Sequence, residues 1–350
     1  GERARVIMVS KEINKDPEVL KIGKTSIKRG KRVNLSLEVA ALYDHTPLSI
    51  PIEVIRGKEG GPTLFISAAV HGDELNGVEI IRRILKRKEI NHIKGTLILV
   101  PVVNIFGFNN KSRYLPDRRD LNRSFPGTST GSLASRMAKL FMKEVISKCT
   151  HGIDLHTGAI HRSNLPQIRA CLDDEKTRDL AKSFGVPVII DSKLRDGSLR
   201  EAARTKKVTT LLFEGGEALR FNEDVIKSGI KGCFAVMEKI GMVKRPPSKK
   251  PRPLRNVFIA NSSYWIRSPH SGTVHFSKSI GDNIKSGDLL ATVSNTFGRE
   301  SIDIYSKEDG ILVGISVLPL VNQGDALFHL ATFKNTTKVK KALELYGEDE

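Results

Sequence analysis

The sequence predicts an α/β domain with a largely parallel central sheet and helices on both faces, followed by a small all-β domain. Apolar strand segments alternate with helical segments up to residue 243, which is typical of α/β domains. A stretch rich in Pro and Lys, residues 244–255, then interrupts the alternation and is typical of a linker. Short strands separated by Gly-Asp turns follow this stretch and indicate the second, all-β domain.

Residues 1–54 are expected to form short strands that pack on the α/β domain. The segment KRVNLSLEVAAL alternates apolar and polar residues, and LSIPIEVIRG follows it before the Gly60–Gly61–Pro62 turn. Two such segments predict an antiparallel hairpin at the edge of the sheet.

The α/β domain itself is assigned to residues 55–243. Ligand sites in such domains collect at the carboxyl ends of the parallel strands. The predicted strands are TLFISAAV, TLILVPVVN, GIDLHTG, VPVII and VTTLLFEGG, and the predicted helices are LNGVEIIRRILKRK, LASRMAKLFMKEVISKC and EKTRDLAKSFG.

Residues 256–335 contain a weak internal repeat. The segment SPHSGTV…IGDNIKSGDLLATV is echoed by SKEDGILVG…VNQGDALFHL, so that Gly272 matches Gly310 and Gly287–Asp288 matches Gly324–Asp325. This pattern resembles the barrel-sandwich hybrid of biotinyl and lipoyl domains, but the lysine context of those carriers (MKM or DKA) is missing. We therefore expect a lid or wall beside the α/β domain, followed by a short helical tail at residues 336–350.

Composition predicts a globular cytoplasmic protein with a sizeable core. The chain has 350 residues, 39% of them hydrophobic, and contains no apolar run of the ~20 residues that a membrane helix needs. The first residues lack the apolar core of a signal peptide, although the chain begins with Gly1, so a removed leader stays an open alternative. Its three cysteines are widely spaced without a CxxC motif and are expected to be reduced thiols.

The net charge of +18 raises the question of nucleic acid binding. The basic residues are spread along the whole chain, and the aromatic residues that could stack on bases make up only 6%. The charge therefore indicates a solvated surface with a bias towards small anionic substrates, and neither a nucleic acid nor a membrane is expected as a partner.

A cluster of polar residues stands at the end of the predicted strand in FISAAVHGDELNG. His71 and Glu74 can turn towards one point, and His156 from GIDLHTG would complete a His₂Glu zinc site with one open position, where water can be activated. The simpler alternative is that Asp73 and Glu74 complement a helix dipole, and that His156 is a packed core residue.

Further candidates follow the other predicted strands. Glu214 lies near the end of the strand TTLLFEGG and is a candidate general base, with a surface acid as the alternative. The two glycines after it would let the backbone approach a substrate closely. The loop SRYLPDRRDLNRSFPG offers Arg113, Asn122 and Arg123, and guanidinium groups match carboxylates. Asp154 receives no role. Surface or packing roles are expected for the histidines without a partner motif: His45, His92, His151, His161, His270, His275 and His329.

The motifs HGDE, DLNRSFPG, DLHTG and FEGG, in this order, resemble the succinylglutamate desuccinylase/aspartoacylase family of the zinc carboxypeptidase clan. The resemblance covers nearly the whole chain. It implies a zinc-carboxypeptidase-like central mixed sheet flanked by helices, with a barrel-sandwich-like C-terminal domain.

The resemblance also implies roles for individual residues. One Zn²⁺ per chain would be held by His71, Glu74 and His156, while Glu214 would activate water and Arg113 would steady the oxyanion. A substrate carboxylate would be bound by Asn122 and Arg123. Asp120 would hydrogen-bond the first zinc histidine. Arg204 matches a further arginine that contacts substrate, although Arg200 is an alternative.

The implied function is a zinc-dependent amidohydrolase that cleaves the amide bond of a small anionic N-acyl amino acid. A carboxypeptidase acting on short peptides is an alternative with the same chemistry. A non-catalytic binding or carrier protein is a further alternative, but it would be recognised by a broken ligand set, and this set is complete. The acyl group, the amino acid and the oligomeric state, including a homo-oligomer, stay open.

Overall fold

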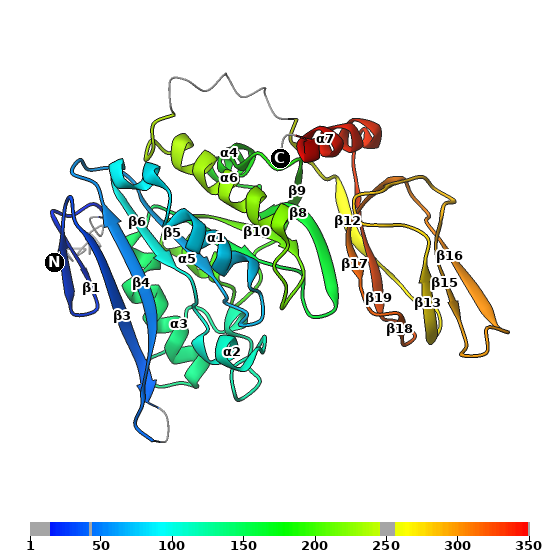
Figure 1. The fold of residues 1–350 in the computed structure, drawn as a ribbon, viewed down its shortest axis with the longest axis horizontal. Helices are drawn as coiled ribbons and strands as arrows, with labels where there is room; N and C mark the ends of the chain where they lie inside the picture. Colours follow the sequence, from blue (N-terminus) through cyan, green and yellow to red (C-terminus); the bar gives the residue numbers. More distant parts are fainter. Residues whose placement is uncertain (1–14, 42–43, 246–255, 349–350) are drawn as a thin grey trace, which may run out of the picture.

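A large mixed sheet forms the centre of the molecule. The computed structural model describes residues 15–41, 44–245 and 256–348. In these residues the sheet has 13 strands and continues from the α/β part into the C-terminal β strands (Figure 1). Helices cover both faces of its α/β part, which confirms the predicted fold class.

The four strands at the centre of the sheet are parallel and lie in the order β6–β5–β7–β10. Strands β5 and β6 are buried along their whole length, as expected for strands covered on both faces. The sheet as a whole is mixed, because antiparallel strands flank this centre on both sides. These four strands are β5 (Thr63–Ala68), β6 (Thr96–Val100), β7 (His151–His156) and β10 (Thr209–Gly216).

The helices form one layer on each face of the sheet, and each layer has its own apolar core. Two predicted helices are shorter than expected, because a 3₁₀ turn at Lys88–His92 follows the first and another at Ile146–Lys148 follows the second. One layer contains α1 (Asn76–Ile84), α4 (Glu175–Phe184) and α6 (Glu223–Lys239), and the other contains α2 (Ile105–Asn110), α3 (Leu133–Glu144) and α5 (Leu199–Thr205).

The predicted N-terminal hairpin is present at one edge of the sheet. Strands β3 (Arg32–Ala41) and β4 (Pro47–Arg56) pair antiparallel, and β4 also pairs with β6. Strands β1 (Val19–Ile22) and β2 (Thr25–Lys28) form a separate two-stranded sheet. Residues 1–14 and 42–43 of the predicted N-terminal segment lie outside the described residues.

Strand β8 (Arg162–Ala170) is an element that the sequence analysis missed. It lies between β10 and β17 and so joins the α/β part to the C-terminal strands. Its sequence, RSNLPQIRA, carries Pro166, which normally argues against a central strand. The proline is tolerated because the β8–β10 register shifts between Glu214 and Gly216, leaving a bulge at this point.

The C-terminal strands form two packed sheets around an apolar core, as in a barrel-sandwich. Most of the predicted linker, residues 246–255, lies outside the described residues. One of the sheets is part of the central sheet and consists of β11 (Phe258–Ile259), β12 (Ser262–Arg267), β14 (Asn283–Ile284), β17 (Gly310–Ser316) and β19 (Ala326–Thr332). In it, β11 pairs with β9 (Val188–Asp191) of the α/β part. The other consists of β13 (Gly272–Phe276), β15 (Leu289–Ser294), β16 (Ser301–Tyr305) and β18 (Leu320–Val321).

Reciprocal hydrogen bonds join the two halves of the internal repeat. The backbone N–H of Gly287 donates to the carbonyl of Ser306 at 2.8 Å, and the N–H of Gly324 donates to the carbonyl of Ser268 at 2.8 Å. Both glycines have φ of +90°, which explains why glycine stands at this turn in each repeat. Each half therefore closes on the beginning of the other, as the sequence repeat predicts.

The hairpin between the two halves offers no carrier lysine. Its turn, residues 295–300 between β15 and β16, reads NTFGRE. Phe297 in this turn is 80% exposed. The wall or lid role of the C-terminal strands stays a prediction.

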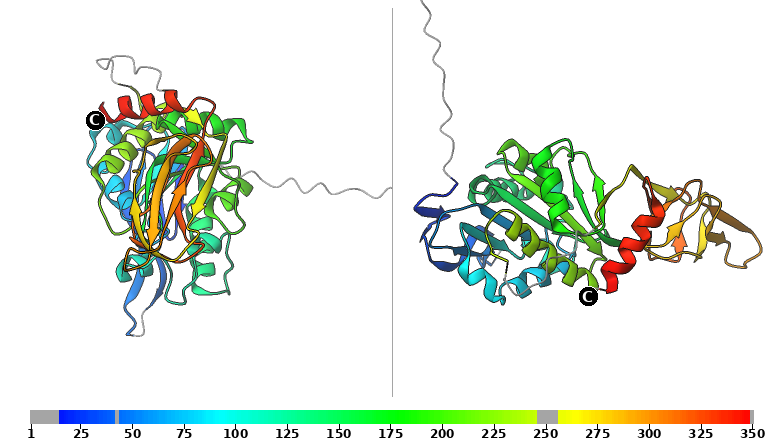
Figure 2. Two further views of the ribbon diagram at one scale, coloured as in Figure 1. Left: turned by 90° about the vertical axis from the view of Figure 1, so that its right-hand side faces the viewer. Right: turned by 90° about the horizontal axis from the view of Figure 1, so that it is seen from above.

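The predicted tail helix is present as α7 (Thr336–Glu348), which packs against β14 and β17 beside the junction between the two parts of the chain (Figure 2). The three cysteines form no disulfide, and Cys149 and Cys233 are buried. Among the helices of residues 15–41, 44–245 and 256–348, none has both the length and the apolar character needed to cross a membrane.

Candidate active site

The predicted site residues gather at the carboxyl ends of three adjacent parallel strands. His71 and Glu74 follow β5, and His156 is the last residue of β7. Glu214 lies near the end of β10, where its Cα pairs with that of His156. This is the edge of the sheet at which the alternation of strands and helices predicted a site.

The turn after β5 is fixed by its backbone. The N–H of Asn104 donates to the carbonyl of Ala69 at 2.9 Å, which ties the turn to the segment after β6. Gly72 lies directly against α2, since a Cβ at this position would approach the carbonyl carbon of Gly107 to 2.1 Å. The HGDE sequence therefore needs its glycine so that His71 and Glu74 can face the same point.

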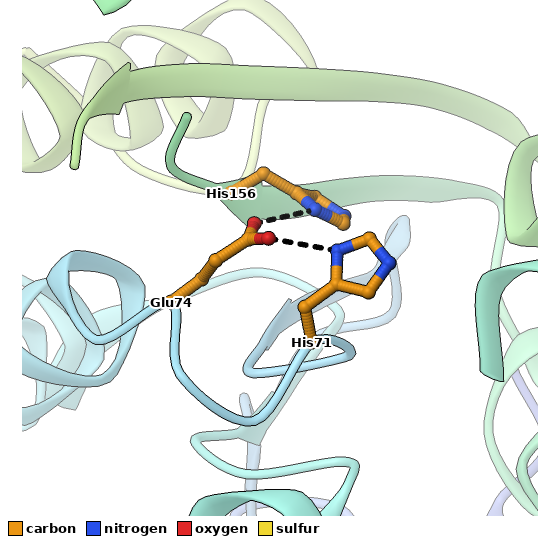
Figure 3. A group of neighbouring side chains, drawn as sticks. All are labelled: His71, Glu74 and His156. Atoms are coloured by element: carbon orange, nitrogen blue, oxygen red, sulfur yellow. Dashed lines mark hydrogen bonds and ion pairs between the residues drawn. The ribbon is translucent and has the colours of Figure 1, made fainter. Parts of the chain in front are cut away.

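The carboxylate of Glu74 contacts both imidazole rings from one side (Figure 3). Its Oε2 is 2.8 Å from Nδ1 of His71, and its Oε1 is 3.0 Å from Nδ1 of His156. All three side chains are buried, and their potential ligand atoms lie within 4.8 Å of one another. The three residues could therefore hold one metal ion, as the sequence predicted.

A carboxylate holds the other nitrogen of each ring. Nε2 of His71 is 2.9 Å from Oδ1 of Asp120, and Nε2 of His156 is 2.6 Å from Oδ2 of Asp154. The hydroxyl of Ser67 donates to Asp154 at 2.9 Å. Partners of this kind fix the tautomer, so that each Nδ1 can face a metal. Asp154, which had no role assigned from the sequence, thus orients His156.

The electrostatics of the cluster fit a divalent cation. Burial alone would lower the pKa values of both histidines, but the carboxylates of Glu74, Asp120 and Asp154 outweigh it and raise them. Burial would raise the pKa of Asp120, yet His71 and Arg113 lower it to about 2. The same carboxylates that raise the histidine pKa values would also stabilise a divalent cation between the ligand atoms.

The environment of Nδ1 of His71 also supports a metal site here. This atom is buried and makes no hydrogen bond of normal geometry, although it lies close to Glu74. Buried polar atoms are rarely left without a partner, and a ligand atom is an ordinary exception. Two imidazole nitrogens and one carboxylate form the donor set of catalytic zinc sites.

Arg113 reaches the edge of this cluster. Its Nη1 donates to Oε2 of Glu74 at 3.1 Å, and its Nη2 lies 3.7 Å from Oδ2 of Asp120. The guanidinium group therefore stands beside the candidate metal position, where it could interact with an oxygen of a bound molecule.

Asn122 and Arg123 lie beside each other at a 3₁₀ turn, Leu121–Arg123. Asp120 begins this turn and accepts a hydrogen bond from the N–H of Asn122 at 2.8 Å. The side-chain oxygen of Asn122 accepts from the N–H of Leu199 at 2.9 Å, and Nη1 of Arg123 donates to the carbonyl of Asn122 at 2.7 Å. These bonds hold both side chains at the wall of the cavity described next.

A cavity of about 240 Å³ joins the cluster to four further candidates, Arg113, Asn122, Arg123 and Glu214. Six arginines line the cavity but only two acidic side chains, Glu74 and Glu214, so its wall is strongly positive. Its six arginines are Arg113, Arg123, Arg162, Arg169, Arg195 and Arg200. Such a cavity attracts an anion.

Glu214 faces this cavity, and its Oε2 lies 2.9 Å from Nε of Arg169. The two glycines after it do not serve as expected, since they lie outside the cavity lining. Gly216 has φ of +69°, and a Cβ on it would approach Oδ1 of Asn222 to 2.2 Å. These glycines therefore allow close packing of the protein rather than the approach of a substrate.

Arg204 is not brought to the site. It is half-exposed on α5, where its Nη1 lies 3.1 Å from Oδ1 of Asp173. Arg200, one helical turn earlier, is 9% exposed and lines the cavity. Its Nη1 has no hydrogen-bond partner, and its Nη2 donates to the hydroxyl of Ser192 at 3.3 Å. Of the two arginines that the sequence offered, Arg200 has the position of a substrate contact.

Known proteins resemble this chain in sequence and in fold. The sequence profile of the succinylglutamate desuccinylase/aspartoacylase catalytic domain matches residues 60–240. The N-alpha-acetyl-L-2,4-diaminobutyric acid deacetylase of Halomonas elongata is 27% identical over 295 residues, which cover 81% of this chain and 85% of that protein.

Solved structures show the same fold. A succinylglutamate desuccinylase from a Silicibacter species has a TM-score of 0.76 at 22% identity, covering 87% of this chain and 95% of that chain. The product-bound ectoine utilization protein EutE from Ruegeria pomeroyi also has a TM-score of 0.76 at 22% identity, with coverage of 86% and 94%.

Proposed function

The chain belongs to the succinylglutamate desuccinylase/aspartoacylase family, and from this premise we propose that it is a zinc-dependent deacylase. Its substrate is a small N-acyl amino acid, whose amide bond it hydrolyses. One observation carries the proposal: His71, Glu74, His156, Glu214 and Arg123 face one small, positively charged cavity. The Halomonas relative, by its name, removes an acetyl group from an amino acid, which supports this substrate class.

His71, Glu74 and His156 would hold the zinc ion. When bound, zinc would act as a Lewis acid towards the substrate carbonyl and lower the pKa of a bound water molecule to about 7. Asp120 and Asp154 keep Nδ1 of each histidine available by accepting hydrogen bonds from Nε2.

Glu214 acts as the general base and then as the general acid. Its carboxylate takes a proton from the attacking water and passes it to the nitrogen of the leaving amine, so no external proton source is needed. Arg113, beside Glu74, donates hydrogen bonds to the amide oxygen as negative charge develops on it.

Asn122 and Arg123 orient the substrate by its α-carboxylate. A guanidinium group presents two parallel donors to a carboxylate, which fixes direction as well as distance. Arg200 offers a further guanidinium, which is buried, on the same cavity, and its unpartnered Nη1 is available to the substrate. Arg200 thus replaces Arg204 in the set of proposed substrate contacts.

The size of the cavity favours an amino acid derivative over a peptide. Trp265, from the C-terminal strand β12, lines the cavity beside residues of the α/β part. The cavity volume of about 240 Å³ lies below the 300–1,000 Å³ typical of pockets for drug-sized ligands. A carboxypeptidase would need an open cleft here. The complete ligand set and the nearby carboxylate of Glu214 likewise argue against a non-catalytic protein.

Substitution of the base tests the proposal. The Glu214→Gln variant should keep its zinc and its substrate binding but lose several orders of magnitude in kcat, because an amide cannot accept the proton. Turnover within tenfold of the parent would remove Glu214 from the mechanism.

A further inference from the structure

We propose that Arg169 and His329 are positioning residues that hold the carboxylate of Glu214 in its working place. The C-terminal β strands would then support catalysis directly, in addition to walling the cavity. This inference rests on the proposed function, because it takes Glu214 as the base. It concerns residues to which the sequence motifs assign no role.

Arg169 connects Glu214 to the neighbouring strand. Its Nε lies 2.9 Å from Oε2 of Glu214 and 3.3 Å from Oε1 of Gln167. Gln167 and Arg169 alternate along β8, so they lie on one face of the strand, and the Cα of Gln167 pairs with that of Glu214. The base is therefore held from β8, the strand that joins the two parts of the chain.

Gln167 is itself fixed by the C-terminal strands. It is fully buried, and its Nε2 donates to the carbonyl of Val313 on β17 at 3.1 Å and to that of Leu165 at 2.9 Å. With both amide protons engaged, the orientation of its Oε1 towards Arg169 is determined.

His329 supplies the second support. Its Nδ1 lies 3.4 Å from Nη2 of Arg169, so a neutral ring can accept a hydrogen bond from the guanidinium group. Burial, followed by the charges of Arg169 and Arg162, lowers the pKa of His329 to about 3. The ring is consequently neutral at neutral pH, as an acceptor for arginine must be.

Aromatic stacking fixes the plane of this ring. His329 stacks on Trp265 with ring centroids 4.8 Å apart and an interplanar angle of 14°, and the guanidinium of Arg162 lies 4.5 Å from the centre of the Trp265 ring. Trp265 and His329 are direct partners in the β12–β19 pair, and His329 is paired with Gly314 on β17.

Gly314 makes room for this arrangement. A Cβ at this position would lie 3.4 Å from Trp265 and 2.8 Å from Oδ1 of Asn164, which is on β8. The tight approach is to Asn164, so glycine lets β8 pack closely on β17, while the Trp265 ring lies over this position and lines the cavity. A continuous row of contacts thus runs from β12 to the catalytic edge of the sheet.

Control over Glu214 matters because catalytic groups tolerate little displacement. A misplacement of about 1 Å can cost about 100-fold in rate. Arg169 is the cation within ion-pair distance of Glu214 among the described residues, and it is itself held by the neutral acceptors Gln167 and His329. Loss of Gln167 or His329 would leave the guanidinium group of Arg169 less fixed, and the carboxylate of Glu214 would then be less well positioned.

The variants separate positioning from substrate binding. Arg169→Gln should lower kcat by about 100-fold with KM changed less than about threefold, and Arg169→Lys should restore part of the loss. His329→Phe keeps the stack but removes the acceptor, whereas His329→Asn keeps an acceptor near the Nδ1 position. We expect roughly a tenfold loss in kcat for the Phe variant and near-parent turnover for the Asn variant. His275→Phe, at an exposed position of β13, is the matched control, and zinc content and Tm report on folding.

A double-mutant cycle decides whether Arg169 acts through Glu214. In the Glu214→Gln background, Arg169→Gln should cost less than about threefold in kcat, because both changes remove one function. A loss of about 100-fold there, or a loss confined to KM, would overturn the inference in favour of direct substrate contact. A parent enzyme without amidase activity would instead contradict the proposed function.

Crystal structures of the two variants test the positioning without any substrate. In Arg169→Gln and His329→Phe, the carboxylate of Glu214 should move by about 1 Å or lose its ordered density. A Glu214 side chain that stays in place in both variants would overturn the inference.

Discussion

Nε2 of His156 lies 2.6 Å from Oδ2 of Asp154, two residues earlier on the same strand. The two side chains lie on the same face of β7, because residues two apart on a strand do so. Asp154 thereby orients His156 just as a carboxylate on a distant loop orients His71. Each candidate metal histidine therefore has its own carboxylate, and this geometry leads directly to the metal prediction.

The purified protein should contain about one zinc ion per chain, because the three side chains form the His₂Glu set of catalytic zinc sites. His71→Ala and His156→Ala should lose the metal, whereas Asp154→Asn should keep the fold and weaken zinc affinity about 10–100-fold. Metal analysis and chelator competition measure these effects, with exposed His275→Ala as the control. Full zinc content in both histidine variants would show that the ligand set is wrong.

The protein stripped of metal should lose stability as the pH rises above about 6.5. The neighbouring carboxylates, against the effect of burial, raise the folded-state pKa values of His71 and His156. Their contribution is therefore complete below the unfolded pKa and disappears as the pH passes the folded values. Glu74 and Asp120 have lowered pKa values, so their contribution is present above about pH 4 and is lost in acid.

Urea unfolding between pH 5 and 9, with and without zinc, measures this effect. Zinc should remove the loss of stability on the alkaline side, because the ion then replaces the two Nδ1 protons. An equal alkaline loss in the zinc-loaded protein would argue against a metal between these rings.

Arg200 and Arg204 should differ sharply in their effect on activity. Arg200→Gln should raise KM by about tenfold or more, because it removes a buried guanidinium from the cavity wall. Arg204→Gln should leave kcat/KM within about twofold, since Arg204 is not among the residues that line the cavity and its surface ion pair contributes only about 0–1 kcal/mol to stability. Steady-state kinetics decide the matter. The opposite ranking would restore the original assignment of Arg204.

Much of the fold could be predicted from local patterns. Strand β5 is apolar along its length and α4 has a helical apolar period, so both were recognisable. Strand β8 was not, because Pro166 and several polar residues conceal it and its bulge is a tertiary feature. Because β8 was not recognised, the sequence predicted two separate domains, although the α/β strands and the C-terminal strands share one sheet through β8. The proposed boundaries at residues 54, 243 and 335 stay predictions.

The candidate site was predictable where residues stand in compact motifs. HGDE and DLHTG identify a ligand set that the structure brings within 4.8 Å. Asp154 could have been found from its i, i+2 spacing to His156. Arg200 and Arg204 lie on the same short helix, and only the packing of that helix shows which of them reaches the cavity. Their distance from Glu214 in the sequence does not contain this information. Arg169 and His329 meet only through the pairing of strands far apart in sequence.

Hydrolysis of a panel of N-acetyl, N-succinyl and N-formyl amino acids by the zinc-loaded protein tests the central claim most directly. The panel includes amide-capped versions of each compound and short peptides. We predict that at least one free-acid N-acyl amino acid releases its amine, that capping the α-carboxylate greatly weakens the reaction, and that Glu214→Gln slows it by several orders of magnitude. Short peptides should be poor substrates. Release of amino acids from peptides, with every N-acyl amino acid left intact, would contradict the account.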